Sequence, residues 1–362
     1  CLGKMLDQNK NKGDYQPYLA NVNVRWGEFD LEDLPLMKFE ESEQERYELK
    51  YGDLVICEGG EPGRCAIWKE QIPNMKIQKA LHRVRVHDCL DYRYLFYWFL
   101  LAGKTGELDQ YFTGATIKHM PGQKLKEVVI DKPPLEIQHR IADILSAYDD
   151  LIENNQKQIK LLKEAAKRLY KEWFVDLHFP GHENTKIVDG VPEGWRRGLL
   201  KELISVNYGK DHKKVPDDGN IPVYGSGGLM RKCNKSLFSG EAVLIPRKGS
   251  LNNIMYVDET FWTVDTMFYA TMKQPHTAVF VYFFVKAFDM YSMNIGAAVP
   301  SMTTKILDAM DVVIPDKETL EKFDKYAKVY FNKIKTLQGQ NEQLKTARDL
   351  LLPKLMSGEV EV

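Results

Sequence analysis

Two long segments of the chain repeat apolar residues at alternating spacings of four and three. The first runs from residue 141 to 173 and the second from residue 323 to 355. This spacing places the apolar side chains in one stripe along a helix and is the pattern of a coiled-coil seam. Each stripe contains one asparagine near its middle, and a buried asparagine in such a seam fixes register and partner at a cost in stability. The seam positions on which we rely are Leu145, Ile152, Asn155, Ile159, Leu337, Asn341 and Leu344.

We therefore predict two long helices, over residues 135–178 and 319–362. Pairing the two antiparallel would bury both stripes within one chain and would place a folded unit at each end of a rigid rod. At 1.5 Å per residue the first helix would be roughly 60 Å long. The alternative is a pair of ordinary amphipathic helices, each packed on its own domain, and the unbroken run of in-register positions argues against it.

The region before each helix carries a related series of shorter patterns. Residues Gly114–Met120 resemble Gly296–Met302, and a Val-Val-Ile strand signal follows each motif, at 128–130 and at 312–314. Residues Gly52–Ile56 likewise resemble Gly240–Leu244. Apolar, aromatic stretches at Tyr92–Leu101 and Ala278–Phe288 predict one buried helix in each copy. A period this long exceeds that of solenoid repeats and indicates whole duplicated domains.

The predicted fold class is thus α+β, with two similar domains related by a pseudo-two-fold axis and joined by the two helices. The first domain covers residues 1–134 and the second residues 179–318. The second copy has Trp195–Asn207 ahead of Gly209-Lys210, whereas the first copy opens almost at once on Gly3-Lys4. We therefore expect that a short N-terminal piece of the first domain is missing.

The bulk composition is ordinary for a globular protein: 362 residues, 44% hydrophobic and 28% charged. The longest apolar runs, at 94–102 and 279–285, are too short to cross a bilayer, so no membrane association is predicted. The five cysteines are odd in number and show no Cys-x-x-Cys spacing. This usage is typical of reduced thiols and favours a cytoplasmic protein.

The net charge of −1 does not by itself indicate nucleic-acid binding. The charge is nevertheless segregated, because residues 71–87 contain no acid while residues 28–48 are strongly acidic. Segregation of this kind can produce a basic face on a neutral protein. Charge alone does not distinguish such a face from ordinary solvated surface.

Several catalytic motifs are absent from the sequence. Gly103-Lys104-Thr105 lacks the glycine that a phosphate-binding loop needs at position 98, where Trp98 stands. Gly225-Ser226-Gly227-Gly228 has no third glycine at the offset of a nucleotide-binding loop. No Asn-Pro-Pro-Tyr-type loop for adenine methylation occurs, and no cluster of His, Cys and carboxylates has the spacing of a metal site. We predict a binding protein without catalytic residues, metal or cofactor.

Polar residues in the turns carry the groups that read bases in DNA. Arg and Lys pair with guanine, Asn and Gln pair with adenine, and Ser and Thr contact either. For any single residue, ordinary surface remains the better interpretation, whereas the set lies at comparable places in both copies. The candidates are Arg25, Glu58, Arg64, Gln78, Lys79, His82 and Arg83 in the first domain, and Lys210, His212, Lys213, Tyr224, Ser226, Arg247, Lys248, Ser250, Asn252 and Thr266 in the second.

The order of these patterns resembles the specificity subunits of type I restriction-modification systems over essentially the whole chain. The resemblance rests on residues 52–64, on the two glycine motifs with their Val-Val-Ile strands, on Pro134–Gln138 at the first helix and on Val191–Trp195 at the entry of the second domain. The second copy departs at Pro315–Glu318, which lacks the Pro-Pro-Leu-x-x-Gln form.

The resemblance implies a non-catalytic DNA reader with two target-recognition domains. Each domain would read one half of an asymmetric bipartite sequence in double-stranded DNA, and the helices would set the gap. The helices would also recruit two adenine-N6 methyltransferase subunits, which carry the S-adenosylmethionine, and motor/nuclease subunits would join for cleavage.

Two other interpretations remain open at this point. The chain could be a coiled-coil adaptor with two peptide-binding heads, or the recognition part of a single-chain methylating nuclease. Salt-dependent binding to DNA separates the first from a DNA reader, because phosphate contacts weaken steeply with salt. Co-purification with a separate methyltransferase separates the second.

Overall fold

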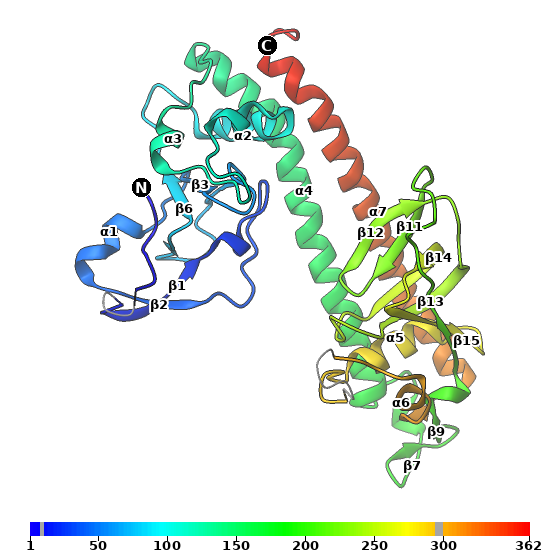
Figure 1. The fold of residues 1–362 in the computed structure, drawn as a ribbon. Coiled ribbons are helices and arrows are strands. Elements are labelled where there is room, and N and C mark those ends of the chain that lie inside the picture. Colours follow the sequence, from blue (N-terminus) through cyan, green and yellow to red (C-terminus); the bar gives the residue numbers. More distant parts are fainter. Residues whose placement is uncertain (8–10, 294–299) are drawn as a thin grey trace. The chain divides into compact units, whose positions relative to one another are not determined.

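The computed structural model describes residues 1–7, 11–293 and 300–362 and divides into two compact units. Unit 1 consists of residues 1–155 and 339–362, and unit 2 of residues 156–338. Each of the two long helices is therefore shared: helix α4 (Leu135–Tyr170) and helix α7 (Lys317–Met356) each contribute one half to each unit. A π-helical turn, Lys171–Val175, extends α4 (Figure 1).

Unit 1 contains two small sheets and three short helices. Strand β1 pairs antiparallel with β2 and parallel with β5, and β3 lies between β4 and β6 with both pairs antiparallel. The strands are β1 (Asp14–Leu19), β2 (Leu36–Phe39), β3 (Leu54–Cys57), β4 (Cys65–Ile67), β5 (Lys76–Ile77) and β6 (Leu81–Val84). The helices are α1 (Gln44–Tyr47), α2 (Tyr92–Thr105) and α3 (Gly122–Lys126), and the 3-10 turns are Asn21–Asn23, Glu41–Glu43 and Glu107–Tyr111.

Unit 2 is built on a six-stranded sheet of order β10-β15-β13-β14-β11-β12. Its strands are β10 (Ile204–Tyr208), β11 (Ile221–Gly225), β12 (Gly228–Cys233), β13 (Phe238–Pro246), β14 (Met255–Thr263) and β15 (Met267–Met272). Two further pairs are β7 (Ile187–Val188) with β8 (Val191–Pro192), and β9 (Arg196–Leu199) with β16 (Asp311–Ile314). The helices are α5 (Ala278–Lys286) and α6 (Thr304–Asp308), and the 3-10 turns are His182–Asn184 and Leu200–Glu202.

The predicted duplication is present in the strand order. In unit 1, β3 lies between β4 and β6; in unit 2, β13 lies between β14 and β15, again with antiparallel pairing on both sides. An apolar helix follows in each unit, α2 or α5, then a short helix, α3 or α6, and then a long helix. The α+β fold class with two related domains and two long helices is confirmed.

Backbone hydrogen bonds fix which residues of the two units correspond. The amide of Gly3 donates to Leu81 O (2.9 Å), and the amide of Gly209 donates to Met267 O (3.0 Å). Leu81 therefore corresponds to Met267. Because Leu81 pairs with Cys57 and Met267 pairs with Pro246, Cys57 corresponds to Pro246.

The alignment of 52–56 with 240–244 is therefore wrong by one residue. It would place Cys57 opposite Ile245 rather than Pro246. A shift of one residue exchanges the two faces of a strand. Strand β3 and the last five residues of β13 are apolar and buried without a break, so this part of the sequence has no alternation from which the register could be read.

The two long helices run antiparallel within each unit. In unit 1, Ile141 and Leu145 of α4 share a hydrophobic cluster with Leu352 and Leu355 of α7, and the aromatic residues of α2 belong to the same cluster. In unit 2, Ile159 of α4 packs with Ile334 and Leu337 of α7. From Ile141 to Ile159 of α4, the contacting residues of α7 change from Leu355 and Leu352 to Leu337 and Ile334, so the two helices run in opposite directions.

The two seam asparagines contact each other. In unit 1, Asn155 Nδ2 donates to Asn341 Oδ1 at 2.9 Å, and both side chains are buried. The predicted seam residues Leu145, Ile152, Asn155, Ile159, Leu337 and Asn341 are all buried, and Leu344 is half-buried. A buried amide retains its hydrogen bond only in the one register that brings the other amide opposite it.

Different residues anchor the start of each long helix. The buried Gln138 donates to Pro133 O (2.7 Å) and accepts from the amide of Asp91 (2.9 Å), which ties α4 to the N-terminus of α2. At α7, Asp316 accepts from the amide of Thr319 (2.9 Å) and from Trp195 Nε1 (2.9 Å). The divergent Pro315–Glu318 segment thus supplies an aspartate N-cap in place of the glutamine anchor.

We expect Asn155→Leu to lower the free energy of unfolding by about 1–3 kcal/mol, because it leaves the Asn341 amide buried without its partner. The double variant Asn155→Leu/Asn341→Leu should recover most of this loss, because it removes both buried polar groups. Urea denaturation followed by far-UV circular dichroism measures both effects. A single variant as stable as the parent would show that the amide pair does not contribute.

Candidate nucleic-acid interface

Equivalent loops follow the central strand of each unit. In unit 1 the loop is residues 58–64, and its first amide, Glu58 N, donates to Ala80 O at 2.9 Å. In unit 2 the loop is residues 247–253, and Arg247 N donates to Thr266 O at 2.8 Å. Glu58 and Arg247 therefore occupy the same position with opposite charge. We refer to these segments as the strand-end loops.

A third segment holds each strand-end loop. Glu58 O accepts from Met120 N (2.7 Å), and Arg247 O accepts from Met302 N (2.9 Å). Met120 and Met302 end the two glycine motifs that are repeated in the sequence, so these motifs support the loops. Residues 296–299 of the second motif lie outside the described residues.

The β11–β12 turn packs on the strand-end loop of unit 2. Asn253 Nδ2 donates to Ser226 O at 2.8 Å. Gly249 has φ +83°, and a Cβ at this position would lie 2.8 Å from Ser226 Oγ, so no larger side chain fits without displacement. The loop also reaches the segment after α5, since Asn252 Nδ2 donates to Asp289 Oδ1 at 3.0 Å. The predicted residues that meet here are Ser226, Arg247, Lys248, Ser250, Asn252 and Thr266.

The other predicted residues of unit 2 lie on the segment before β11 and on β11 itself. Lys210, His212 and Lys213 belong to residues 209–215, which Arg231 of β12 anchors through Nη2 to His212 O (2.6 Å) and to Val215 O (2.9 Å). Tyr224 donates its hydroxyl to Glu259 Oε1 at 2.5 Å, and burial together with this bond raises the pKa of Tyr224. Its hydroxyl is already paired, so Tyr224 supports β11 against β14.

The strand-end loop of unit 1 is tied to the segment after β1. Arg64 Nη2 donates to Asn21 O (3.2 Å), Asn21 Nδ2 donates to Gly59 O (2.7 Å), and Arg64 Nη1 pairs with Glu61 (3.2 Å). Arg25 is exposed, and its guanidinium donates to Val22 O at 2.5 Å. Of the predicted residues, Glu58 and Arg64 therefore lie in this loop, and Arg25 follows the Asn21–Asn23 turn to which the loop is bonded.

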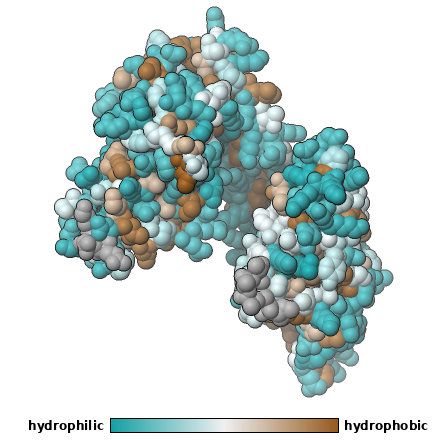
Figure 2. Space-filling view, viewed as in Figure 1, coloured by the Kyte–Doolittle hydropathy of each residue, from teal (hydrophilic) through white to brown (hydrophobic). Residues whose placement is uncertain are grey.

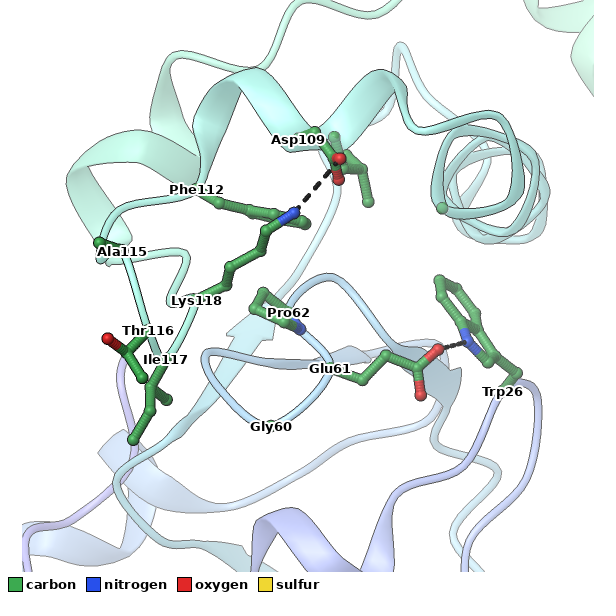
Figure 3. A pocket seen from close by; sticks show the side chains of 12 residues that line it. Trp26, Gly60, Glu61, Pro62, Asp109, Phe112, Ala115, Thr116, Ile117 and Lys118 are labelled. Carbon is green, nitrogen blue, oxygen red and sulfur yellow. Dashed lines mark hydrogen bonds and ion pairs between the residues drawn. The ribbon is translucent and has the colours of Figure 1, made fainter.

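A hollow of about 620 Å³ lies beside this loop (Figure 3). Trp26 closes one side, with its Nε1 donating to Glu61 Oε1 at 2.6 Å. The other side is formed by residues 108–118, where the Lys118 ammonium lies 3.4 Å from Asp109 and 5.5 Å from the centre of the Phe112 ring. Trp26 was not among the residues predicted from the sequence, although an aromatic residue between Arg25 and Gly27 in a turn is a signal for a stacking surface.

The remaining predicted residues of unit 1 lie on or before β6. His82 is 3% exposed, its Nε2 lies 3.1 Å from Met120 O, and burial lowers the pKa of its ring. A buried ring cannot touch a ligand at the surface, so His82 lies outside the interface. Arg83 donates to Glu48 O at 2.7 Å, Gln78 is half-buried, and Lys79 is exposed.

Hydrophilic residues cover most of the face shown in Figure 2. Across residues 1–7, 11–293 and 300–362, no group of His, Cys, Asp and Glu side chains could hold a metal ion. Within the same ranges, no helix is both long enough and apolar enough to span a membrane.

Comparison with protein families assigns both halves of the chain. The family model "Type I restriction modification DNA specificity domain" matches residues 3–164 and again residues 192–346. The chain belongs to this family. The two matches include the strand-end loops of both units.

Curated relatives and a solved structure agree with this membership. The MjaIX specificity subunit of a type I restriction enzyme from Methanocaldococcus jannaschii is 27% identical over 352 residues, covering 86% of this chain and 78% of the relative. The MjaVIII specificity subunit of the same organism is 24% identical, covering 96% and 87%. The crystal structure of the type I restriction-modification S subunit from M. genitalium has the same fold at 19% identity, with a TM-score of 0.57 over 98% of this chain and 92% of that chain.

The packing of the strand-end loop of unit 2 on the β11–β12 turn should depend on Gly249. We expect Gly249→Ala to lower the free energy of unfolding by about 1–3 kcal/mol, because an L-residue at φ +83° is strained and its Cβ would press on Ser226. Gly227→Ala, in the β11–β12 turn next to Ser226 but with nothing within 4 Å of the added Cβ, should be near neutral. Urea denaturation of both variants makes the comparison. Equal stabilities would contradict the packing of turn on loop.

Proposed function

We propose that this chain is the DNA-recognition subunit of a type I restriction-modification complex and reads a bipartite target, with one half-site for each unit. The observation that carries the proposal is the pair of equivalent strand-end loops. Their backbone bonds are the same in both units, whereas their side chains differ, as Glu58 and Arg247 illustrate. Two units that bind two different half-sites need the same backbone support for their loops and different polar side chains on them.

The paired helices support the second part of the proposal. We infer that they set the gap between the half-sites and recruit two methyltransferase subunits, with S-adenosylmethionine bound on those subunits. Motor/nuclease subunits join the same complex in the cytoplasm. The chain itself performs recognition without catalysis, so modification of adenine belongs to the partner.

The experiment that tests this function is co-expression of the chain with its methyltransferase in a host without other adenine methylation. Methylation mapping by long-read sequencing should show a single motif of two defined segments separated by a fixed number of unspecified base pairs. A continuous motif, or methylation independent of this chain, would contradict the proposal.

The basic residues of one strand-end loop should affect one half-site. We expect Arg247→Ala/Lys248→Ala to lower affinity for the target at least tenfold, since one good bidentate base contact is worth about 1–3 kcal/mol. The methylation motif should become relaxed in one segment and stay strict in the other. Competition binding at constant salt and motif mapping measure the two effects.

Lys273→Ala is the matched control, because Lys273 is an exposed lysine of the same unit that bonds to Lys201 O away from the loop. It should change neither affinity nor motif. Equal relaxation of both segments by the loop variant would contradict one reader per unit.

The two long helices, α4 and α7, should determine the number of unspecified base pairs between the two half-sites. Inserting seven residues after Asn155 and seven before Asn341 preserves the heptad spacing and adds about 10.5 Å of helix. At about 3.4 Å per base pair, the unspecified gap in the motif should lengthen by roughly three base pairs. The same insertion in α4 alone should abolish methylation, because it places the seam residues out of register. An unchanged gap with both insertions would rule out the spacer role.

A further inference from the structure

The hairpin formed by β11 and β12 ends in two exposed apolar side chains. Leu229 is 60% exposed and Met230 is 54% exposed. Tyr224 pairs with Leu229 and Val223 pairs with Arg231, so Met230 is an extra residue at a register shift and has no residue opposite it. Both side chains are more than half exposed, so the start of β12 forms a two-stranded ribbon that is open to solvent at the edge of the sheet.

The position of this ribbon is fixed. Gly225 pairs with Gly228, so only Ser226 and Gly227 form the turn. The turn is fastened to the strand-end loop of unit 2 through the bond from Asn253 to Ser226 O. The turn that precedes the apolar pair is consequently held against the loop that carries Arg247 and Lys248, the residues proposed to contact DNA.

Leaving this pair uncovered is unfavourable for the chain. Strand β12 is at the edge of the six-stranded sheet, and exposed apolar residues on an edge promote aggregation. The surrounding charge indicates what covers them. Residues 209–235 contain six lysines and arginines and three aspartates, a net charge of +3 with histidine neutral. A polyanion that offers small apolar groups fits this surface.

The geometry points to the C5-methyl groups of thymine. We propose that the β11–β12 ribbon enters the major groove of the half-site read by unit 2 and that Leu229 and Met230 contact thymine methyls there. The major groove admits a two-stranded β-ribbon, and the thymine methyl is the apolar group that it displays. The inference rests on the proposed DNA-reading function and adds a base preference to it.

The contact is specific to unit 2. Strand β1 of unit 1 corresponds to β11, since Tyr18 pairs parallel with Lys76 as Val223 pairs parallel with Trp262. In unit 1, however, residues 20–35 join β1 to β2 where two residues join β11 to β12. The two units thus share a frame and differ in the element that projects from it.

Uracil in place of thymine provides the test, because it removes only the methyl group. The full chain, assembled with its methyltransferase, is titrated with duplexes of the mapped target in which each thymine is replaced singly by uracil. We expect about a fourfold loss of affinity at a contacted position, the factor that corresponds to one buried methyl-sized group. Replacements in the other half-site should have no effect.

The variants Leu229→Ser and Met230→Ser complete a double-substitution cycle. Each should bind the thymine duplex about as weakly as the parent binds the uracil duplex, and should no longer distinguish the two bases. Ile187→Ser is the control, because Ile187 is 57% exposed in another hairpin of unit 2. Met230→Leu should retain the discrimination.

Three results would overturn the inference. They are equal affinity for every uracil duplex, a unit 2 half-site without any A·T pair, and serine variants that lose methyltransferase binding while still distinguishing uracil. The last would identify the ribbon as a protein-docking element. A parent complex that binds all DNA sequences equally would instead refute the proposed function.

Discussion

Packing of the long helices into the cores of both units is the constraint on which the rest of the structure depends. In unit 1, Ile141 and Leu145 complete the cluster around α2. In unit 2, Tyr170 stacks on Phe283 with ring centres 5.4 Å apart, and Trp173 lies 5.8 Å from Phe323. Without these helices, the apolar faces of α2 and α5 would be exposed to water. Each unit therefore needs its parts of the two long helices to complete its hydrophobic core.

This arrangement explains how two units with unlike surface residues can share one backbone framework. The amides of Glu58 and Arg247 make the same backbone bond, and the carbonyls of both residues accept from a methionine amide. The frame is specified by backbone bonds and apolar strands, which tolerate changes in exposed side chains. The loop residues and the ribbon beyond β11 are then free to differ, and specificity can change without loss of stability.

The sequence predicted the larger features well. The heptad stripes predicted two long helices with one asparagine in each seam, because helical periodicity and a lone polar position are local signals. The bond between Asn155 and Asn341 was seen only in the structure. The duplicated motifs gave two related domains. The predicted register of the central strand was wrong by one residue, since β3 and the last five residues of β13 are buried without alternation. His82 was placed among exposed groups, although its strand turns it toward Met120 O.

By itself, the sequence determined the helices, their antiparallel pairing, the duplication and the family. These depend on patterns of neighbouring residues or on repetition, both of which are visible along the chain. Only the tertiary structure decided which polar residues meet, that Trp26 borders a hollow, and that Leu229 and Met230 are exposed on a hairpin whose turn is bonded to the strand-end loop. Those properties depend on contacts such as Asn253 Nδ2 with Ser226 O, which join residues far apart in the chain and cannot be read from residue types alone.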